Sequence, residues 1–304
     1  MTLAAHVESA GRNLGGRMRS VYEGPAGWRK WQEYLAGDDH EDLAEVFTRV
    51  RRRGTDGTRM RWSRDWRTRT FCDLGLYLLY RHTLNHTAGV EPMEMRIFAR
   101  LQASALADLA AVLIEDPSEA EAMTVQRFND TWGQQSGYCE DLVCYLFRPG
   151  PYMRRLSRLH PELLAMTHRL TLGEWVRQSA VKELNSAVAD PLIAMHTLVE
   201  AVLPATPLVR SLVSRLRRAR LRKWAQLYED GFAAFGVQPR ADLDWLDIAE
   251  RFSTIAGGAF LRAQTRIDQQ EPATDGEMLG QLVIEVLPAL CAIEAGEIGA
   301  RRAV

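Results

Sequence analysis

Residues 275–297, DGEMLGQLVIEVLPALCAIEAGE, carry the clearest fold signal in the chain. Apolar side chains recur there every three and four positions, the spacing that places them on one face of an α-helix. This face consists of Met278, Leu279, Leu282, Val283, Val286, Leu287 and Leu290. Because so wide an apolar face can pack on two neighbouring helices, we expect a helical bundle. It also supplies our candidates for a homodimer interface: Leu279, Leu282, Val283, Val286 and Leu290.

The same spacing recurs along the chain, and no segment shows the two-residue alternation of a strand. Glycine and proline separate the periodic stretches. The sequence therefore predicts an all-α, multi-helix bundle. The expected helices span 3–22, 28–35, 38–54, 61–86, 91–115, 118–132, 139–147, 151–159, 161–169, 172–187, 191–202, 207–236, 242–267 and 275–297.

Composition excludes several classes of protein. The chain has 304 residues and a formal net charge of −1, so it is not a polycation as a whole. No apolar run approaches the roughly 20 residues that span a bilayer, and the first residues lack the apolar core of a signal peptide. Its 4 cysteines are scattered and suit small buried side chains in a reducing compartment. We expect a cytoplasmic protein with no membrane partner.

Motifs for catalysis or metal binding are weak. Asp38 to Asp42 reads DDHED, which resembles the DDxxD motif of helical terpene synthases, and paired carboxylates can hold Mg²⁺. The acids also suit the start of a helix, where negative charge is stabilised. His82 and His86 have the spacing of two metal ligands but no third. Because the sequence has no nucleophile or phosphate-binding motif, we expect no catalysis, cofactor or metal. A metal-dependent helical enzyme built around Asp38 to Asp42 remains an alternative, ranked third among the functions considered below.

Two clusters of basic residues stand out. Residues 49–69 contain only two acids, Asp56 and Asp65, and interleave Trp62 and Trp66 with nine arginines. Clustered guanidinium groups contact phosphates, and aromatic faces stack on bases or on arginine. The alternative is a solvated helix whose arginines pair with acids elsewhere in the fold. A second cluster, residues 210–223, is interpreted as the solvated face of a helix with an apolar opposite side.

Residues 123–156, MTVQRFNDTWGQQSGYCEDLVCYLFRPGPYMRRL, carry the most specific pattern. Thr124 and Val125 are followed by Phe128 and by Gly133, at spacings that resemble the helix-turn-helix of tetracycline-repressor (TetR) family regulators. In such a motif the glycine permits the turn and the second helix presents polar residues to a major groove. The DNA-contacting residues that the resemblance implies are Thr124, Arg127, Gln134, Gln135, Ser136 and Tyr145. The sequence departs from the family in the 100 residues before the motif and in the longer interval after Gly133.

Residues 224–265 resemble the end of a TetR regulatory domain, with a long helix, a G-V-x-P-R-x-D-x-D turn and a helix containing Ala256-Gly257-Gly258. The resemblance implies three parts: a helical extension or lobe over 1–100, a divergent helix-turn-helix region over 101–160, and a ligand-binding and dimerisation domain over 161–304. The ligand would be small and mostly apolar. Its expected contacts are Trp175, His196, Trp224, Tyr228 and Phe252.

The leading expectation is therefore a homodimeric transcription regulator that binds DNA and a small apolar ligand. Ligand binding would shift the population between two dimer geometries. The alternative is an all-helical ligand-binding or protein-interaction module that has lost DNA binding.

Overall fold

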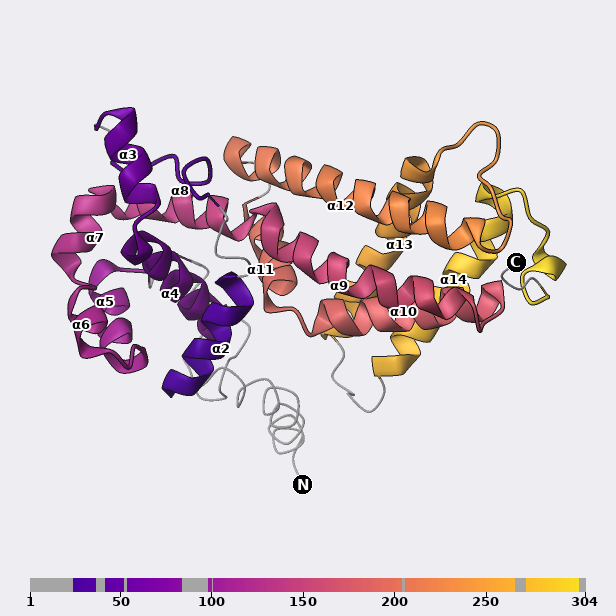
Figure 1. Cartoon of the computed structure of the whole chain (residues 1–304), viewed down its shortest axis with the longest axis horizontal. Helices are drawn as coiled ribbons and strands as arrows, with labels where there is room; N and C mark the ends of the chain where they lie inside the picture. Colours follow the sequence, from indigo (N-terminus) through magenta and orange to yellow (C-terminus); the bar gives the residue numbers. More distant parts are fainter. Residues whose placement is uncertain are drawn as a thin grey trace, which may run out of the picture. The chain divides into compact units, whose positions relative to one another are not determined.

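The computed structural model describes residues 24–36, 42–51, 54–83, 98–99, 101–203, 206–265 and 272–300. These residues form helices and connecting turns, with no strand among them apart from an isolated bridge between Pro239 and Cys291 (Figure 1). The expected all-α class is confirmed. No helix in the described ranges is long and apolar enough to cross a membrane. The expected helix over 3–22 lies outside the described residues.

The chain divides into two compact units. Unit 1 comprises residues 1–151 and 194–212, and unit 2 comprises residues 152–193 and 213–304. Residues 1–100 and 101–151 thus belong to the same unit. The described helices of unit 1 are α2 (Gly24–Ala36), α3 (Asp56–Ser63), α4 (Trp66–Thr83), α5 (Ala103–Leu113), α6 (Pro117–Glu121), α7 (Val125–Trp132), α8 (Gln135–Leu146) and most of α11 (Pro191–Val202).

Aromatic side chains form much of the core of unit 1. Trp31 stacks on Tyr80, with ring centroids 5.4 Å apart. Phe128, in α7, contacts Tyr138 in α8 at 4.9 Å. The Tyr138 hydroxyl donates a 2.8 Å hydrogen bond to the carbonyl of Phe71 in α4. Aromatic pairs add to the stabilisation from burying apolar area, and these contacts join α2, α4, α7 and α8.

Unit 2 contains most of α9 (Pro149–Thr167), α10 (Leu172–Val188), most of α12 (Pro207–Ala233), α13 (Trp245–Thr265), α14 (Pro272–Leu290) and a short 3₁₀ helix, η1 (Ala295–Glu297). α10 and α14 pack along each other (Figure 1). A Cβ atom on Gly280 would lie 2.7 Å from the Cα of Arg177, and one on Gly276 would lie 2.6 Å from the Cα of Val181. The two glycines therefore let these helix backbones approach each other closely.

Several expected helices differ in the structure. The expected helix over 38–54 is wrong in its described part, because residues 42–51 form turns. The expected helix over 61–86 is divided between α3 and α4, and Asp65 accepts a 2.9 Å hydrogen bond from the N–H of Arg67 at the start of α4. The expected break at Pro161 is also wrong, because α9 continues through it. Leu159 and Leu163, on either side of the proline, are both buried in one apolar cluster with Leu227.

Candidate nucleic-acid interface and ligand cavity

α7 and α8 are joined by the tight turn that the sequence predicts. The Thr124 hydroxyl caps α7 by accepting a 3.0 Å hydrogen bond from the N–H of Arg127. Gly133 ends α7 with a φ of 73°, a left-handed conformation that glycine adopts without steric cost. α8 then begins at once, and Gln134, Gln135 and Ser136 are exposed. This exposed polar turn is the part of the α7–α8 pair that a partner can reach.

A buried aspartate attaches the start of the arginine cluster to these helices. Asp141, in α8, accepts hydrogen bonds from the backbone N–H of Thr48 at 2.7 Å and of Arg49 at 2.9 Å. The indole N–H of Trp132 donates to its other oxygen at 3.0 Å. The N–H of Arg51 donates to the carbonyl of Thr131 at 2.9 Å. These bonds explain why residues 48–51 leave the expected helical path: the N–H groups of Thr48, Arg49 and Arg51 are bound by α7 and α8.

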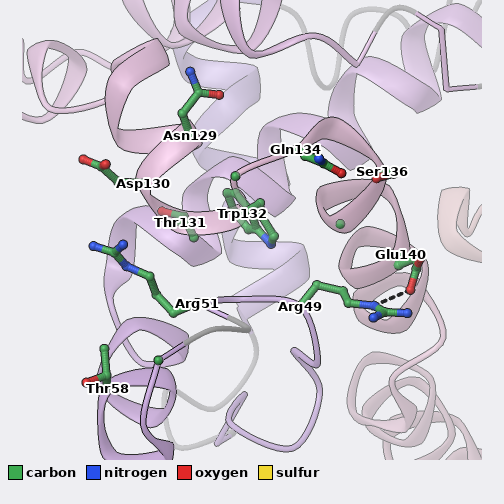
Figure 2. A pocket seen from close by; sticks show the side chains of 13 residues that line it. Arg49, Arg51, Thr58, Asn129, Asp130, Thr131, Trp132, Gln134, Ser136 and Glu140 are labelled. Atoms are coloured by element: carbon green, nitrogen blue, oxygen red, sulfur yellow. Dashed lines mark hydrogen bonds and ion pairs between the residues drawn. The ribbon is translucent and has the colours of Figure 1, made fainter.

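The attached segment and the α7–α8 turn enclose a polar groove of about 560 Å³. Figure 2 shows Arg49 and Arg51 on one side of the groove and the turn that carries Gln134 on the other. The groove is lined by Arg49, Arg51, Gly54, Thr58, Asn129, Asp130, Thr131, Trp132, Gly133, Gln134, Ser136, Gly137 and Glu140. Sequence reasoning had treated the arginine cluster and the turn separately, and the structure brings them together.

The two arginines of the groove differ in their partners. Arg49 forms a 2.5 Å ion pair with Glu140. Arg51 has no ion pair within the described part of the chain, and its guanidinium lies 4.3 Å from the ring centroid of Trp62. An exposed guanidinium without a carboxylate partner can bind a phosphate without first breaking an ion pair. Arg51 is therefore the groove residue best suited to an anionic ligand.

Three further arginines of the cluster are paired, two of them with acids of the cluster itself and one with an acid outside it. Ion pairs join Arg59 to Asp56, Arg64 to Asp42 and Arg67 to Asp65. In the second cluster, residues 210, 215, 217, 218, 222 and 223 are exposed, as expected for a solvated helix face.

The residues expected to contact DNA occupy different environments. Gln134, Gln135 and Ser136 are exposed at the turn, and Gln135 donates a 3.3 Å hydrogen bond to the carbonyl of Phe98. Arg127 is largely buried, bonded to Asp65 at 2.6 Å and 3.7 Å from the Trp62 centroid. Thr124 is exposed and serves as the helix cap.

Tyr145 is 0% exposed and its hydroxyl donates a 2.7 Å hydrogen bond to Asp73, so it cannot reach DNA from this position. Tyr145 was expected to contact DNA but is buried because of its position along α8. Its residues from Asp141 to Leu146 are all buried, and only its first turns are accessible.

Four of the five expected ligand-binding residues line one cavity in unit 2. Trp175, Trp224, Tyr228 and Phe252 line, with other side chains of α10, α12, α13 and α14, a pocket of about 90 Å³. His196 does not belong to it. That side chain is buried in unit 1, where its Nε2 lies 2.8 Å from the carbonyl of Leu146 and its ring packs on Phe147. Sequence reasoning missed Ser179, Glu183 and Arg220, which also line the cavity.

The residues expected at a dimer interface are divided between two faces of α14. Leu279 and Val283 line the cavity, and Leu290 is buried. Leu282 is 39% exposed and Val286 is partly exposed, so these two remain accessible to a second chain. On α13, Leu261 is 51% exposed.

The metal-site hypotheses gain no support from the described residues, among which no group of three His, Cys, Asp or Glu could hold a metal ion. Asp38 to Glu41 lie outside the described residues, and Asp42 is paired with Arg64. His86 and the side chain of His82 also lie outside them.

Asp73 is a buried carboxyl group at the centre of unit 1. Burial raises its pKa to about 6, although the hydrogen bond from Tyr145 and the charges of Arg148 and Arg69 act in the opposite direction. A raised pKa means that the folded state binds the proton more tightly than the unfolded state. This contribution to stability is present below the unfolded pKa near 3.8 and is lost as the pH rises through about 6.

An Asp73→Asn variant is therefore expected to gain stability relative to the unchanged protein as the pH rises from 4 to 7. The full gain would be about 3 kcal/mol, from a pKa difference of about two units. Urea unfolding at several pH values, followed by circular dichroism, measures it. A difference in unfolding free energy that does not vary with pH would contradict this account of Asp73.

Comparison with known proteins returned no matching family model, no matching curated protein and no matching solved structure.

Proposed function

We propose that the chain is a TetR-like transcription regulator that binds DNA as a homodimer and responds to a small, mostly apolar ligand. The observation that carries the proposal is the shared groove of unit 1. There an exposed polar turn, Gln134 to Ser136, lies beside Arg51, which lacks an ion pair in the described part of the chain. Side chains at the start of the second helix of such a motif contact base edges, and arginines beside them contact phosphates.

The groove divides these two roles between different segments. Gln134 and Gln135 offer amide groups that can bond adenine edges, and Ser136 can bond either a base or a phosphate. Arg51 lies on the segment 48–51, which is hydrogen-bonded to α7 and α8, and it supplies the positive charge. Arg127 stabilises this arrangement by pairing with Asp65 and by lying, like Arg51, over Trp62. We therefore assign Arg127 to positioning rather than to DNA contact.

For the homodimer we propose the accessible apolar side chains of α13 and α14, including Leu261 and Leu282. For the ligand we propose the cavity of unit 2, whose aromatic walls suit an apolar molecule.

One observation favours a second candidate, a helical ligand-binding module without DNA binding. Residues 141–146 of α8 are buried, so this helix can offer a DNA groove only its first turns. Asp130 and Glu140 also place two carboxylates in the same groove as the two arginines. This candidate predicts no sequence-specific DNA retention.

The decisive experiment mixes the purified full-length protein with fragmented GC-rich genomic DNA at two salt concentrations and sequences the retained fragments. We expect recovery of a palindromic site that survives the higher salt. A Gln134→Ala/Gln135→Ala variant should lose about ten- to a hundredfold in affinity for that site, the effect of losing a bidentate base contact. Arg51→Gln should weaken binding to all sequences and lower the salt slope by about one.

Arg64→Gln is the matched control, because it removes an exposed arginine of the same cluster that does not line the groove. Its affinity should stay within about twofold of the unchanged protein, since a paired surface charge contributes little. If no fragment is retained, or if all retention is lost at the higher salt, the regulator proposal is rejected in favour of the second candidate.

A further inference from the structure

The cavity of unit 2 combines aromatic walls with a polar end. Trp175, Trp224, Tyr228, Phe232 and Phe252 form the walls. Ser179 and Glu183 lie one turn apart on α10, and Arg220 lies one turn before Trp224 on α12. An enclosed apolar space with a few convergent polar groups is the usual form of a small-molecule site.

One polar group in the cavity lacks a partner. The Ser179 Oγ is shielded from solvent and makes no hydrogen bond. Buried hydroxyl groups nearly always have a hydrogen-bond partner, because burying one without a partner is unfavourable. A ligand atom that accepts a hydrogen bond at this point would satisfy it.

The charges at the polar end are not evenly matched. Glu183 is held by Arg155 through two hydrogen bonds of 2.9 and 3.0 Å, so its negative charge already has a partner. Arg220 lies 4.9 Å from the ring centroid of Tyr152 and, among the described residues, has no ion pair or hydrogen bond. Burial raises the pKa of Glu183, and the charge of Arg220 acts against this rise, but the two side chains form no ion pair. The cavity thus presents one cation that a ligand's anion can still approach, together with one hydroxyl donor.

We propose that the cavity takes a small apolar molecule that carries a carboxylate group. The apolar part lies among Trp224, Tyr228 and Phe252, and the carboxylate accepts hydrogen bonds from Arg220 and Ser179. A cationic ligand fits less well, because Arg220 repels it and Glu183 is already bonded to Arg155. This assignment rests on the ligand-sensing part of the proposed function and names its chemical class. A space of about 90 Å³ is small beside the roughly 300–1,000 Å³ of common ligand pockets, so the ligand is short or widens the cavity as it enters.

The test compares three probes of equal chain length by isothermal titration calorimetry at pH 7.5 with the full chain: hexanoate, hexanamide and hexylammonium. Hexanoate is expected to bind at least tenfold more tightly than hexanamide, and hexylammonium most weakly. Arg220→Gln should reduce hexanoate affinity to that of hexanamide and leave hexanamide affinity unchanged. Ser179→Ala should weaken hexanoate by a smaller factor. Arg218→Gln, an exposed neighbour that does not line the cavity, is the control and should bind like the unchanged protein.

The outcomes separate this inference from the proposed function. If hexanoate and hexanamide bind equally, or if hexylammonium binds most tightly, the carboxylate assignment is overturned while the ligand cavity stands. If none of the three probes binds at millimolar concentration, the inference and the ligand-sensing half of the proposed function both fail. DNA retention is measured separately and does not depend on this result.

Discussion

An Arg155→Ala variant is expected to lose about 3–5 kcal/mol of unfolding free energy, because it leaves buried carboxylates without their cation. The side chains of Arg155 and Glu183 are 11% and 17% exposed, and that of Asp190, 3.8 Å from the guanidinium, is 8% exposed. Burial raises the pKa of Glu183, and the charge of Arg155 acts against this rise. Without Arg155 the pKa rises further, so the loss should be greater at pH 7 than at pH 5. Urea unfolding at both pH values measures it.

Two variants make this prediction specific. Arg155→Met/Glu183→Leu removes the pair together and should recover part of the lost stability, since Glu183 is then no longer a lone buried charge, while Asp190 still lacks the cation. Lys182→Ala breaks the exposed pair with Glu162 and should cost less than about 1 kcal/mol. If Arg155→Ala costs no more than Lys182→Ala, the buried network does not stabilise unit 2 in the way described.

An Asp141→Ala variant is expected to lose about 2–4 kcal/mol and to weaken DNA binding as well. The side chain satisfies the part-buried N–H groups of Thr48 and Arg49 and the buried indole N–H of Trp132. A buried donor left unpaired costs about 1–3 kcal/mol, and a part-buried one costs less because water can reach it. Part of this loss is offset because the carboxylate is itself costly to bury, as its pKa, raised by burial to about 6, shows. Thermal and urea unfolding measure the stability, and DNA retention measures the second effect.

Asp130→Ala is the matched control for Asp141→Ala. Its carboxylate lines the same groove but, among the described residues, its one hydrogen bond is to the amide of Gln126, at 3.1 Å on the surface. Its removal should therefore cost less than about 0.5 kcal/mol. Asp141→Asn keeps one acceptor oxygen and should give an intermediate loss. DNA binding that is unchanged in a destabilised but folded Asp141→Ala protein would show that attachment of the Arg49–Arg51 segment does not shape the groove.

The sequence predicted those helices whose ends are determined locally. α11 spans Pro191 to Val202 as expected, because Pro191 suits a first helical turn and Asp190 accepts the N–H of Leu192 at 2.9 Å. Gly236 has the positive φ expected of a glycine that stops a helix, and α12 ends just before it.

Errors arose where a distant residue decides local structure. Residues 42–51 have apolar positions at helical spacing, but Asp141, more than 90 residues further on, binds the N–H groups of Thr48 and Arg49. Periodicity cannot reveal such a partner. Conversely, α9 continues through Pro161 because Leu159 and Leu163, on either side of it, are both buried in one apolar cluster. The stabilisation from this packing exceeds the cost of a proline inside the helix.

The candidate sites, like the helices, were predictable only where neighbouring residues in the sequence determine them. Arg220, Trp224 and Tyr228 follow one another at four-residue steps, a spacing that could have placed the arginine beside the aromatic residues of the cavity. Nothing in the sequence showed that Tyr145 points into the core, since an aromatic residue near the end of a helix fits either role. Arg51 and Gln134 line the same groove because residues 48–51 are hydrogen-bonded to Thr131 and Asp141, which lie far away in the sequence.

The glycine contact between α10 and α14 has a consequence for how the cavity accommodates its occupant. At Gly276 and Gly280 these helices approach so closely that an added Cβ atom would lie 2.6 Å from the Cα of Val181 and 2.7 Å from the Cα of Arg177. Their shared wall is therefore stiff. We expect a ligand larger than the resting volume to gain room by displacing the opposite wall, where Trp224, Tyr228 and Phe252 can swing aside. The wall formed by α10 and α14 then stays in place while the cavity expands, and the wall formed by α12 and α13 moves.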